Sequence, residues 1–172
     1  MQYDNEDTKK DEQETEKKEP VKVILADDDK DDQETFQDAL NEAKIPTELT
    51  TVNNGQQLMD NLKDPSKPNP DIIFLDINMP VKSGKEALAE IKKDETLKEI
   101  PAVMLSTSES AKDVEDTFNA GANLYMRKPY SFKNFILLLK KVFSLKWAGA
   151  LLKPLRKNFL MSEKNISEKD AD

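Results

Sequence analysis

The amino-acid sequence predicts a doubly wound α/β domain, in which helices cover both faces of a five-stranded parallel sheet. Five short apolar segments of strand length recur along the chain, and a segment with helical periodicity follows each of them. Most of the apolar segments are unbroken aliphatic runs, which are typical of parallel strands buried on both faces. The chain has 172 residues, which is enough for one such domain with polar ends.

The first three strand–helix units are marked by aliphatic runs and by apolar stripes with helical spacing. Residues 21–26, 48–52 and 72–75 are the expected strands. The helices that follow them are expected at 33–43, 55–62 and 85–93, with the stripes Phe36–Ala39–Leu40, Leu58–Met59–Leu62 and Ala87–Leu88–Ile91. Between the second helix and the third strand, three prolines within residues 64–70 block helix and strand pairing, so this stretch is expected to be a surface loop.

The last two units follow the same pattern. Residues 102–105 form the fourth expected strand, and Val114, Thr117 and Phe118 mark a helix at 111–120. The fifth strand is expected at 123–126, and the strongly apolar helix after it at 132–143.

The ends of the chain differ from this middle part in composition. Residues 1–20 contain eight acidic residues and four lysines and offer almost nothing to bury, so they are expected to form a disordered acidic tail. The domain is expected to span 21–143, and residues 144–172 to form a C-terminal extension. Within it, an amphipathic segment at 147–160 is expected to pack on the domain or on a second copy, and a polar tail follows from about residue 161.

Composition excludes several classes of function. The chain has 34 acidic and 26 basic residues, a formal net charge of −8, and no His or Cys. Disulfides, thiolate metal sites and imidazole chemistry are therefore excluded, and the negative charge argues against direct binding of nucleic acid. Because no apolar run is long enough to span a membrane and no export signal is evident, a cytoplasmic protein is expected.

Polar residues follow four of the expected strands at the edge where open parallel sheets bind their ligands. They are Asp27-Asp28-Asp29, Asp76, Ser106 and Lys128. Any one of these acids alone fits a simpler role, such as capping the next helix. Carboxylates that converge from two strands repel one another unless a cation lies between them, and Mg²⁺ prefers such oxygen ligands. Together with a hydroxyl and a lysine, they supply what phosphoryl transfer to a carboxylate requires.

The segments VILADDD, IIFLDINMPVKSG, PAVMLSTS and ANLYMRKPYS resemble the four signature blocks of bacterial response-regulator receiver domains. The resemblance covers roughly residues 21–143 and implies a flavodoxin-like, CheY-like sheet with strand order 2-1-3-4-5. It implies a response regulator of a two-component phosphorelay, which receives a phosphoryl group from a sensor histidine kinase or a histidine phosphotransfer protein. Such a protein catalyses its own phosphorylation and dephosphorylation but is not a dedicated metabolic enzyme.

The resemblance assigns the metal and acceptor roles to residues at two strand ends. Asp27, Asp28 and Asp76 match the family's ligands for Mg²⁺, with Mn²⁺ as an alternative, and the backbone carbonyl of Asn78 completes the set. Asp76 also matches the phosphorylated aspartate. Asp29 is interpreted only as an N-terminal helix residue.

The remaining roles fall at the ends of the fourth and fifth strands. Ser106 and Lys128 match the residues that bind phosphoryl oxygens, and Ser106 and Tyr125 match the pair that couples phosphorylation to a conformational switch. Pro129 matches a proline that the family holds after a cis peptide bond. Arg127 is interpreted as solvated or partner-facing.

The resemblance also implies partners. These are the phosphodonor protein, a downstream protein target, and a second copy of the chain that binds through the fourth helix, fifth strand and fifth helix and through the extension. Stand-alone receivers with such C-terminal arms are similar to the phytochrome-associated response regulators, some of which dimerise through that region.

Two alternatives stay open at this point. A haloacid-dehalogenase-type phosphatase also uses a strand-end Asp nucleophile and Mg²⁺, but Asn78 stands where that mechanism needs a second Asp. A degenerate receiver that serves only as a scaffold is the other alternative, although every motif position is filled here.

Overall fold

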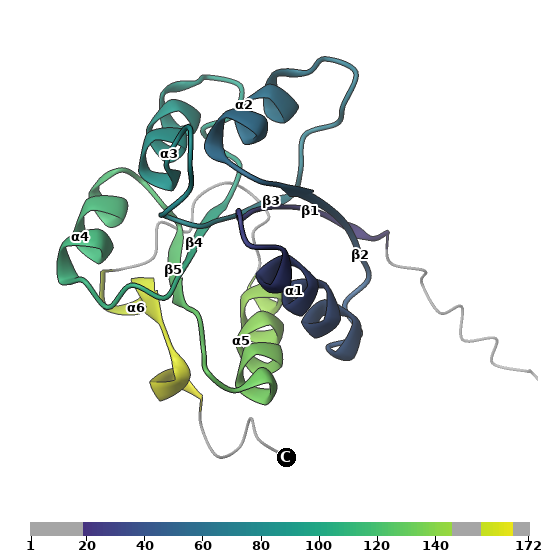
Figure 1. Ribbon diagram of the computed structural model, residues 1–172, viewed down its shortest axis with the longest axis vertical. Coiled ribbons are helices and arrows are strands. Elements are labelled where there is room, and N and C mark those ends of the chain that lie inside the picture. The colour runs from purple at the N-terminus through teal and green to yellow at the C-terminus, as the bar shows by residue number, and fades with distance from the viewer. Residues whose placement is uncertain (1–18, 146–155, 167–172) are drawn as a thin grey trace, which may run out of the picture.

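Six parallel strands form a single sheet in the computed structural model, which describes residues 19–145 and 156–166 (Figure 1). Across the sheet they follow the order β2-β1-β3-β4-β5-β6, and each neighbouring pair is parallel. Their bounds are β1 Val21–Ala26, β2 Thr47–Val52, β3 Ile72–Leu75, β4 Ala102–Ser106, β5 Leu124–Arg127 and β6 Leu160–Met161. The first five strands confirm the predicted order 2-1-3-4-5.

Five helices connect or follow these five strands, and each begins where a polar side chain caps its first turn. They are α1 Lys30–Glu42, α2 Gly55–Lys63, α3 Gly84–Lys93, α4 Ala111–Asn119 and α5 Phe132–Ser144. A side-chain oxygen of the preceding residue accepts a hydrogen bond from a backbone N–H in the first turn of each helix. The capping residues are Asp29, Asn54, Ser83, Ser110 and Ser131. The expected role of Asp29 as an N-terminal helix residue is thereby confirmed.

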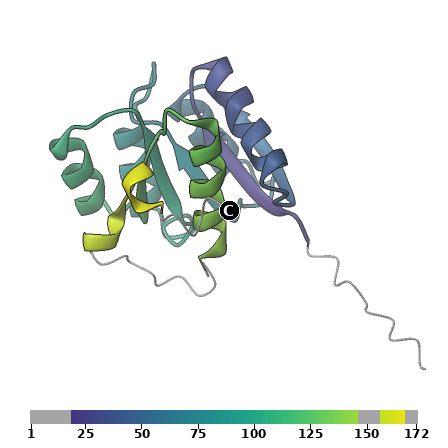
Figure 2. The ribbon, with the colours of Figure 1, turned by 90° about the horizontal axis from the view of Figure 1, so that it is seen from below.

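The helices form two layers, one on each face of the sheet (Figures 1 and 2). Residues of α2, α3 and α4 pack with one set of strand side chains, and residues of α1 and α5 pack with the other. β3 shows why its sequence is aliphatic throughout. Ile73 and Leu75 point to the first layer and Ile72 and Phe74 to the second, and all four are buried. The strand ends are thus fixed between two apolar layers, with their polar residues at one edge.

The C-terminal extension departs from the prediction. A polar tail was expected from about residue 161, but residues 156–166 contain a short helix, α6 Arg156–Phe159, then β6, and then a 3₁₀ turn at Glu163–Asn165. The expectation was wrong for residues 161–166 because Phe159 and Met161 are apolar side chains that find buried positions at the edge of the sheet. The rest of the amphipathic segment, the last six residues and nearly all of the predicted disordered tail lie outside the described residues.

Two further expectations concern the surface. Residues 64–71 form the expected loop between α2 and β3, where the Asp64 carboxylate accepts hydrogen bonds from the backbone and hydroxyl of Ser66. Among the described residues, none of the helices has the length and apolar character needed to cross a membrane.

Candidate functional site

Three carboxylates converge at the carboxyl ends of β1 and β3. Asp27 and Asp28 follow β1, Asp76 follows β3, and each offers an oxygen that lies within 4.8 Å of the other two. Asp27 is buried, Asp76 is half-buried and Asp28 is exposed. The oxygens therefore line a point that is enclosed on one side and open to solvent on the other.

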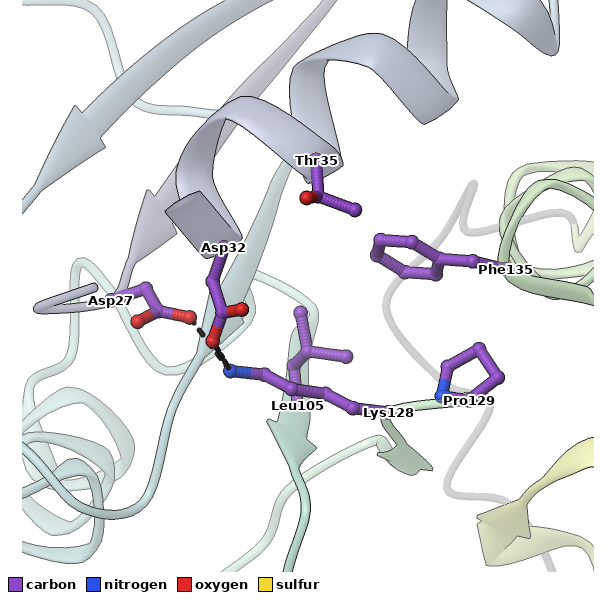
Figure 3. A pocket seen from close by; sticks show the side chains of 7 residues that line it. All are labelled: Asp27, Asp32, Thr35, Leu105, Lys128, Pro129 and Phe135. Carbon is purple, nitrogen blue, oxygen red and sulfur yellow. Dashed lines mark hydrogen bonds and ion pairs between the residues drawn. The ribbon is translucent and has the colours of Figure 1, made fainter. Parts of the chain in front are cut away.

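Lys128 approaches this cluster from the carboxyl end of β5. Its Nζ lies 2.8 Å from Asp27 Oδ2, 2.8 Å from Asp32 Oδ2 and 3.5 Å from Asp76 Oδ2. Figure 3 shows the lysine extended toward Asp27 and Asp32, with Leu105 next to it and Phe135 across the same pocket. The structure thus brings together the predicted residues Asp27, Asp76 and Lys128. Asp32, which was not predicted as a site residue, also contacts Lys128. Its only signal in the sequence is that it follows the Asp27 motif closely enough to lie in the first turn of a helix.

The charges of the site are strongly coupled. Burial raises the pKa of Asp27 above its ordinary value, against the opposing effect of the hydrogen bond from Lys128. Burial likewise raises the pKa of Asp76, again against the charge of Lys128. Burial lowers the pKa of Lys128, but its hydrogen bonds to Asp27 and Asp32 and the charge of Asp76 outweigh this and raise that pKa overall. The lysine is therefore held as a cation. Additional positive charge, such as a metal ion, would stabilise the ionised forms of Asp27 and Asp76.

The carboxylate geometry fits a small divalent cation. Six oxygens at about 2.0–2.1 Å from Mg²⁺ place neighbouring ligands roughly 3 Å apart and opposite ligands roughly 4 Å apart. One carboxylate oxygen from each of Asp27, Asp28 and Asp76 lies within 4.8 Å of the other two, which is close enough for all three to reach one ion after small side-chain adjustments. The backbone N–H of Asn78 donates to Asp76 Oδ1 at 3.3 Å, so the backbone of Asn78 runs beside the cluster. The role of its carbonyl as a ligand stays a prediction.

The loop between β3 and α3 packs the start of α3 directly against the backbone of Asp76. A Cβ atom at Gly84 would lie 1.9 Å from the backbone oxygen of Asp76, so only glycine allows α3 to begin here. The N–H of Gly84 donates to the carbonyl of Ile77 at 2.9 Å, which closes the loop. At the loop's outer end, Val81 has φ 68° and is 81% exposed, and the N–H of Lys82 donates to the carbonyl of Pro80 at 2.7 Å. This is a tight three-residue turn around a β-branched residue in a left-handed conformation.

Replacing Val81 with glycine is expected to stabilise the protein by about 1 kcal/mol, because relief of the left-handed strain exceeds the added flexibility of the unfolded chain. Lys44 is a matched control, since it is exposed and has φ 54° but is not β-branched. Lys44→Gly should give a smaller gain. Denaturant unfolding of the three proteins measures both effects, and a loss of stability in Val81→Gly would contradict the assignment of strain to this turn.

Ser106 and Tyr125 meet at the loop between β4 and α4. The Ser106 Oγ is buried and accepts a hydrogen bond from the N–H of Ser108 at 3.1 Å. Tyr125 is buried as well, and its hydroxyl donates to the carbonyl of Ser108 at 3.2 Å. Burial raises the pKa of Tyr125, although interactions with Ser106 and Ser108 oppose this, so the hydroxyl stays protonated as a donor. The two residues predicted to act as a switch are joined by a single intervening residue.

Two neighbours of Lys128 differ from expectation. The cis peptide bond expected before Pro129 is absent, since every peptide bond in the described ranges is trans. The trans form is intrinsically favoured by about 0.5–1 kcal/mol for X–Pro, and in it the Lys128 side chain already reaches Asp27. Arg127 is only partly solvated: its guanidinium lies 3.8 Å from Glu109, and its Nε is buried and has no hydrogen-bond partner within the part of the chain that the structure describes.

The acidic cluster and the lysine lie at the carboxyl ends of a doubly wound parallel sheet, as the resemblance to receiver domains predicts. The chain belongs to the response regulator receiver domain family, whose profile matches residues 23–140. It is therefore a CheY-like signalling protein of two-component systems rather than a metabolic enzyme, and the phosphatase alternative is set aside.

Several relatives resemble the chain over most of their length. The response regulator Rcp1 of Synechocystis sp. is 32% identical over 139 residues, which are 78% of this chain and 94% of Rcp1. The phosphorylated cyanobacterial phytochrome response regulator RcpA superposes with a TM-score of 0.69 at 36% identity, covering 76% of this chain and 97% of RcpA. The Mn²⁺-bound form of Rcp1 gives a TM-score of 0.68 at 32% identity, covering 79% and 100% of the two chains. Rcp1 thus binds a divalent metal ion in that structure.

Proposed function

We propose that this response regulator accepts a phosphoryl group on Asp76, in a Mg²⁺-dependent reaction, from a phosphohistidine of a sensor kinase or histidine phosphotransfer protein. Mn²⁺ is the alternative metal. The observation that carries the proposal is the convergence of Asp27, Asp28 and Asp76 with Lys128 at one edge of the sheet. Signalling then proceeds through contacts with a downstream protein that depend on phosphorylation.

In the proposed transfer, an oxygen of the Asp76 carboxylate attacks phosphorus and forms an acyl phosphate. The phosphorus–nitrogen bond of the donor breaks, and its electron pair stays with the imidazole. A divalent ion held by Asp27, Asp28, Asp76 and the Asn78 carbonyl would neutralise part of the charge on the phosphoryl oxygens. No proton has to leave Asp76, so the chain contributes mainly positioning and charge.

Lys128 and Ser106 complete the proposed site. The Lys128 Nζ lies 3.5 Å from Asp76, so an added phosphoryl group comes within reach of a cation already present. Because Lys128 has two further carboxylate partners, it can exchange one of these contacts for a phosphoryl oxygen. The Ser106 hydroxyl is the proposed donor to a second phosphoryl oxygen.

The proposal is tested by treating the full chain with acetyl phosphate and Mg²⁺ and locating the phosphoryl group by peptide mass spectrometry. We expect modification of Asp76 alone, its loss when the metal is removed with EDTA, and its recovery with added Mg²⁺ or Mn²⁺. The physical reason is that without a divalent ion the dianionic phosphoryl group meets a cluster of carboxylates. Labelling that is unchanged in EDTA, or that occurs on another acid, would contradict the proposal.

The surroundings of the site belong to the same proposal. Residues 21–143 would be the receiver domain and 144–172 a C-terminal extension, in a protein of the cytoplasm. The output face would comprise α4, β5 and α5, which also would form the homodimer contact together with the extension. Residues 156–166 lie on this face, where they pair with β5 and contact α4.

A further inference from the structure

Residues 156–166, called here the docked segment, occupy the free edge of β5. Leu160 pairs with Tyr125 and Met161 with Met126, in parallel register. Two polar contacts tie the segment to α5: Glu163 accepts a hydrogen bond from the N–H of Ser131 at 3.3 Å, and Lys141 donates to the carbonyl of Asn165 at 2.9 Å. Figure 2 shows the segment (yellow) lying between α4 and α5.

Phe159 is the apolar anchor of the docked segment. It is 1% exposed, and its ring packs edge-on against Phe118 of α4 with centroids 5.1 Å apart. Its second aromatic neighbour is Tyr125 of β5, at 6.3 Å. A buried aromatic pair of this kind contributes beyond its buried area, so the position of the Tyr125 ring affects how firmly the segment is held.

A short chain of contacts joins this anchor to the phosphorylation site. The Ser106 Oγ is bonded to the N–H of Ser108, the Ser108 carbonyl to the Tyr125 hydroxyl, and the Tyr125 ring contacts Phe159. The Ser108 hydroxyl donates to Asp113 at 2.6 Å, which fixes the same loop to α4. The docked segment therefore contacts Tyr125, and the loop between β4 and α4 holds the hydroxyl of this tyrosine through Ser108.

We propose that docking of residues 156–166 and phosphorylation of Asp76 favour each other, with Tyr125 and Phe159 as the coupling pair. This inference rests on the proposed function. A phosphoryl group that binds Ser106 fixes the loop through Ser108, and a fixed loop holds the Tyr125 hydroxyl. The ring is then kept in the buried position where it contacts Phe159. By linkage, a docked Phe159 stabilises the buried Tyr125 and so the loop conformation that accepts the phosphoryl group.

The coupling gives the output face two forms. With the segment docked, the sheet ends at β6, and the surface between α4 and α5 is built partly from residues 158–166. With the segment released, the backbone edge of β5 and the aromatic site of Phe159 are open. Because an unpaired strand edge binds extended peptides, phosphorylation would close this edge and present the composite surface in its place.

Hydrogen exchange of the full chain tests the coupling, with mass spectrometry of peptides that cover residues 158–166. Acetyl phosphate with Mg²⁺ should slow their exchange by about fivefold or more in the natural chain, the lower range of allosteric coupling. Phe159→Leu keeps an apolar anchor but removes the ring contact, so phosphorylation should change its exchange by less than about twofold. Ile166→Ala is the matched control, because Ile166 packs on the opposite layer and does not enter the Tyr125 contact. It should exchange faster overall and yet retain the response.

A second measurement uses reciprocity. Beryllofluoride with Mg²⁺ is an equilibrium mimic of the phosphoryl group. It should bind Phe159→Leu more weakly than the natural chain, by the same factor by which this variant loses the slowing of exchange in residues 158–166. In Ile166→Ala, beryllofluoride should still slow the exchange of these residues. If Asp76 is labelled and the exchange of 158–166 stays unchanged or becomes faster, the coupling is overturned while the proposed function stands. If Asp76 is not labelled at all, the proposed function and the coupling are both overturned.

Discussion

Asp76→Asn is expected to abolish phosphoryl labelling by acetyl phosphate completely. Asparagine has nearly the same shape, but its amide oxygen is a poor nucleophile and carries no negative charge to attract a metal. The variant should also gain less thermal stability from Mg²⁺ than the natural chain, because one of the three converging carboxylates is gone. Intact-mass spectrometry measures the first effect and thermal unfolding with and without Mg²⁺ the second.

The matched control for this variant is Asp31→Asn. Asp31 lies in the first turn of α1 and is exposed, and its replacement by Asn changes the net charge by the same amount as Asp76→Asn. It should be labelled at the rate of the natural chain. If Asp76→Asn were labelled as well as Asp31→Asn, the acceptor would be another residue and the proposed site would be wrong.

The main part of the fold was predictable because its signals are local. Aliphatic runs and apolar stripes with helical spacing depend only on neighbouring residues, and the β3 run Ile72–Leu75 is buried on both faces as its composition indicates. The strand ends follow from these elements. Asp27, Asp76 and Lys128 therefore meet in the structure as the sequence suggested, although they lie far apart along the chain.

The features that escaped prediction depend on contacts between distant segments. Asp32 binds Lys128 because Asp29 caps a helix that begins three residues before its apolar stripe indicated, which turns Asp32 toward the site. β6 has only two residues and a polar stretch follows it, so its sequence carries almost no strand signal. It is held by pairing with the free edge of β5 and by the packing of Phe159 against Phe118, and neither contact is visible in the sequence of the segment itself.

Lys128→Ala is expected to have opposite effects on metal binding and on phosphoryl transfer. The lysine is a largely buried cation in contact with Asp27 and close to Asp76, so it repels a divalent ion at the same cluster. Without it, Mg²⁺ should bind about tenfold more tightly. Phosphoryl transfer from acetyl phosphate should nevertheless slow by about 10²-fold, since removing a charged donor aimed at the developing charge has effects of this order.

Removing the lysine also leaves the carboxylate of Asp27 buried without its partner, which costs about 3 kcal/mol in the absence of metal. The measurements therefore use saturating Mg²⁺ for labelling and a Mg²⁺ titration followed by thermal unfolding for affinity. Lys128→Gln serves as a second variant, because it keeps a hydrogen-bond donor but not the charge. Lys133→Ala, an exposed position on α5, controls for net charge. Weaker Mg²⁺ binding together with undiminished labelling in both Lys128 variants would show that the lysine acts as a structural partner of Asp27 rather than as a ligand of the phosphoryl group.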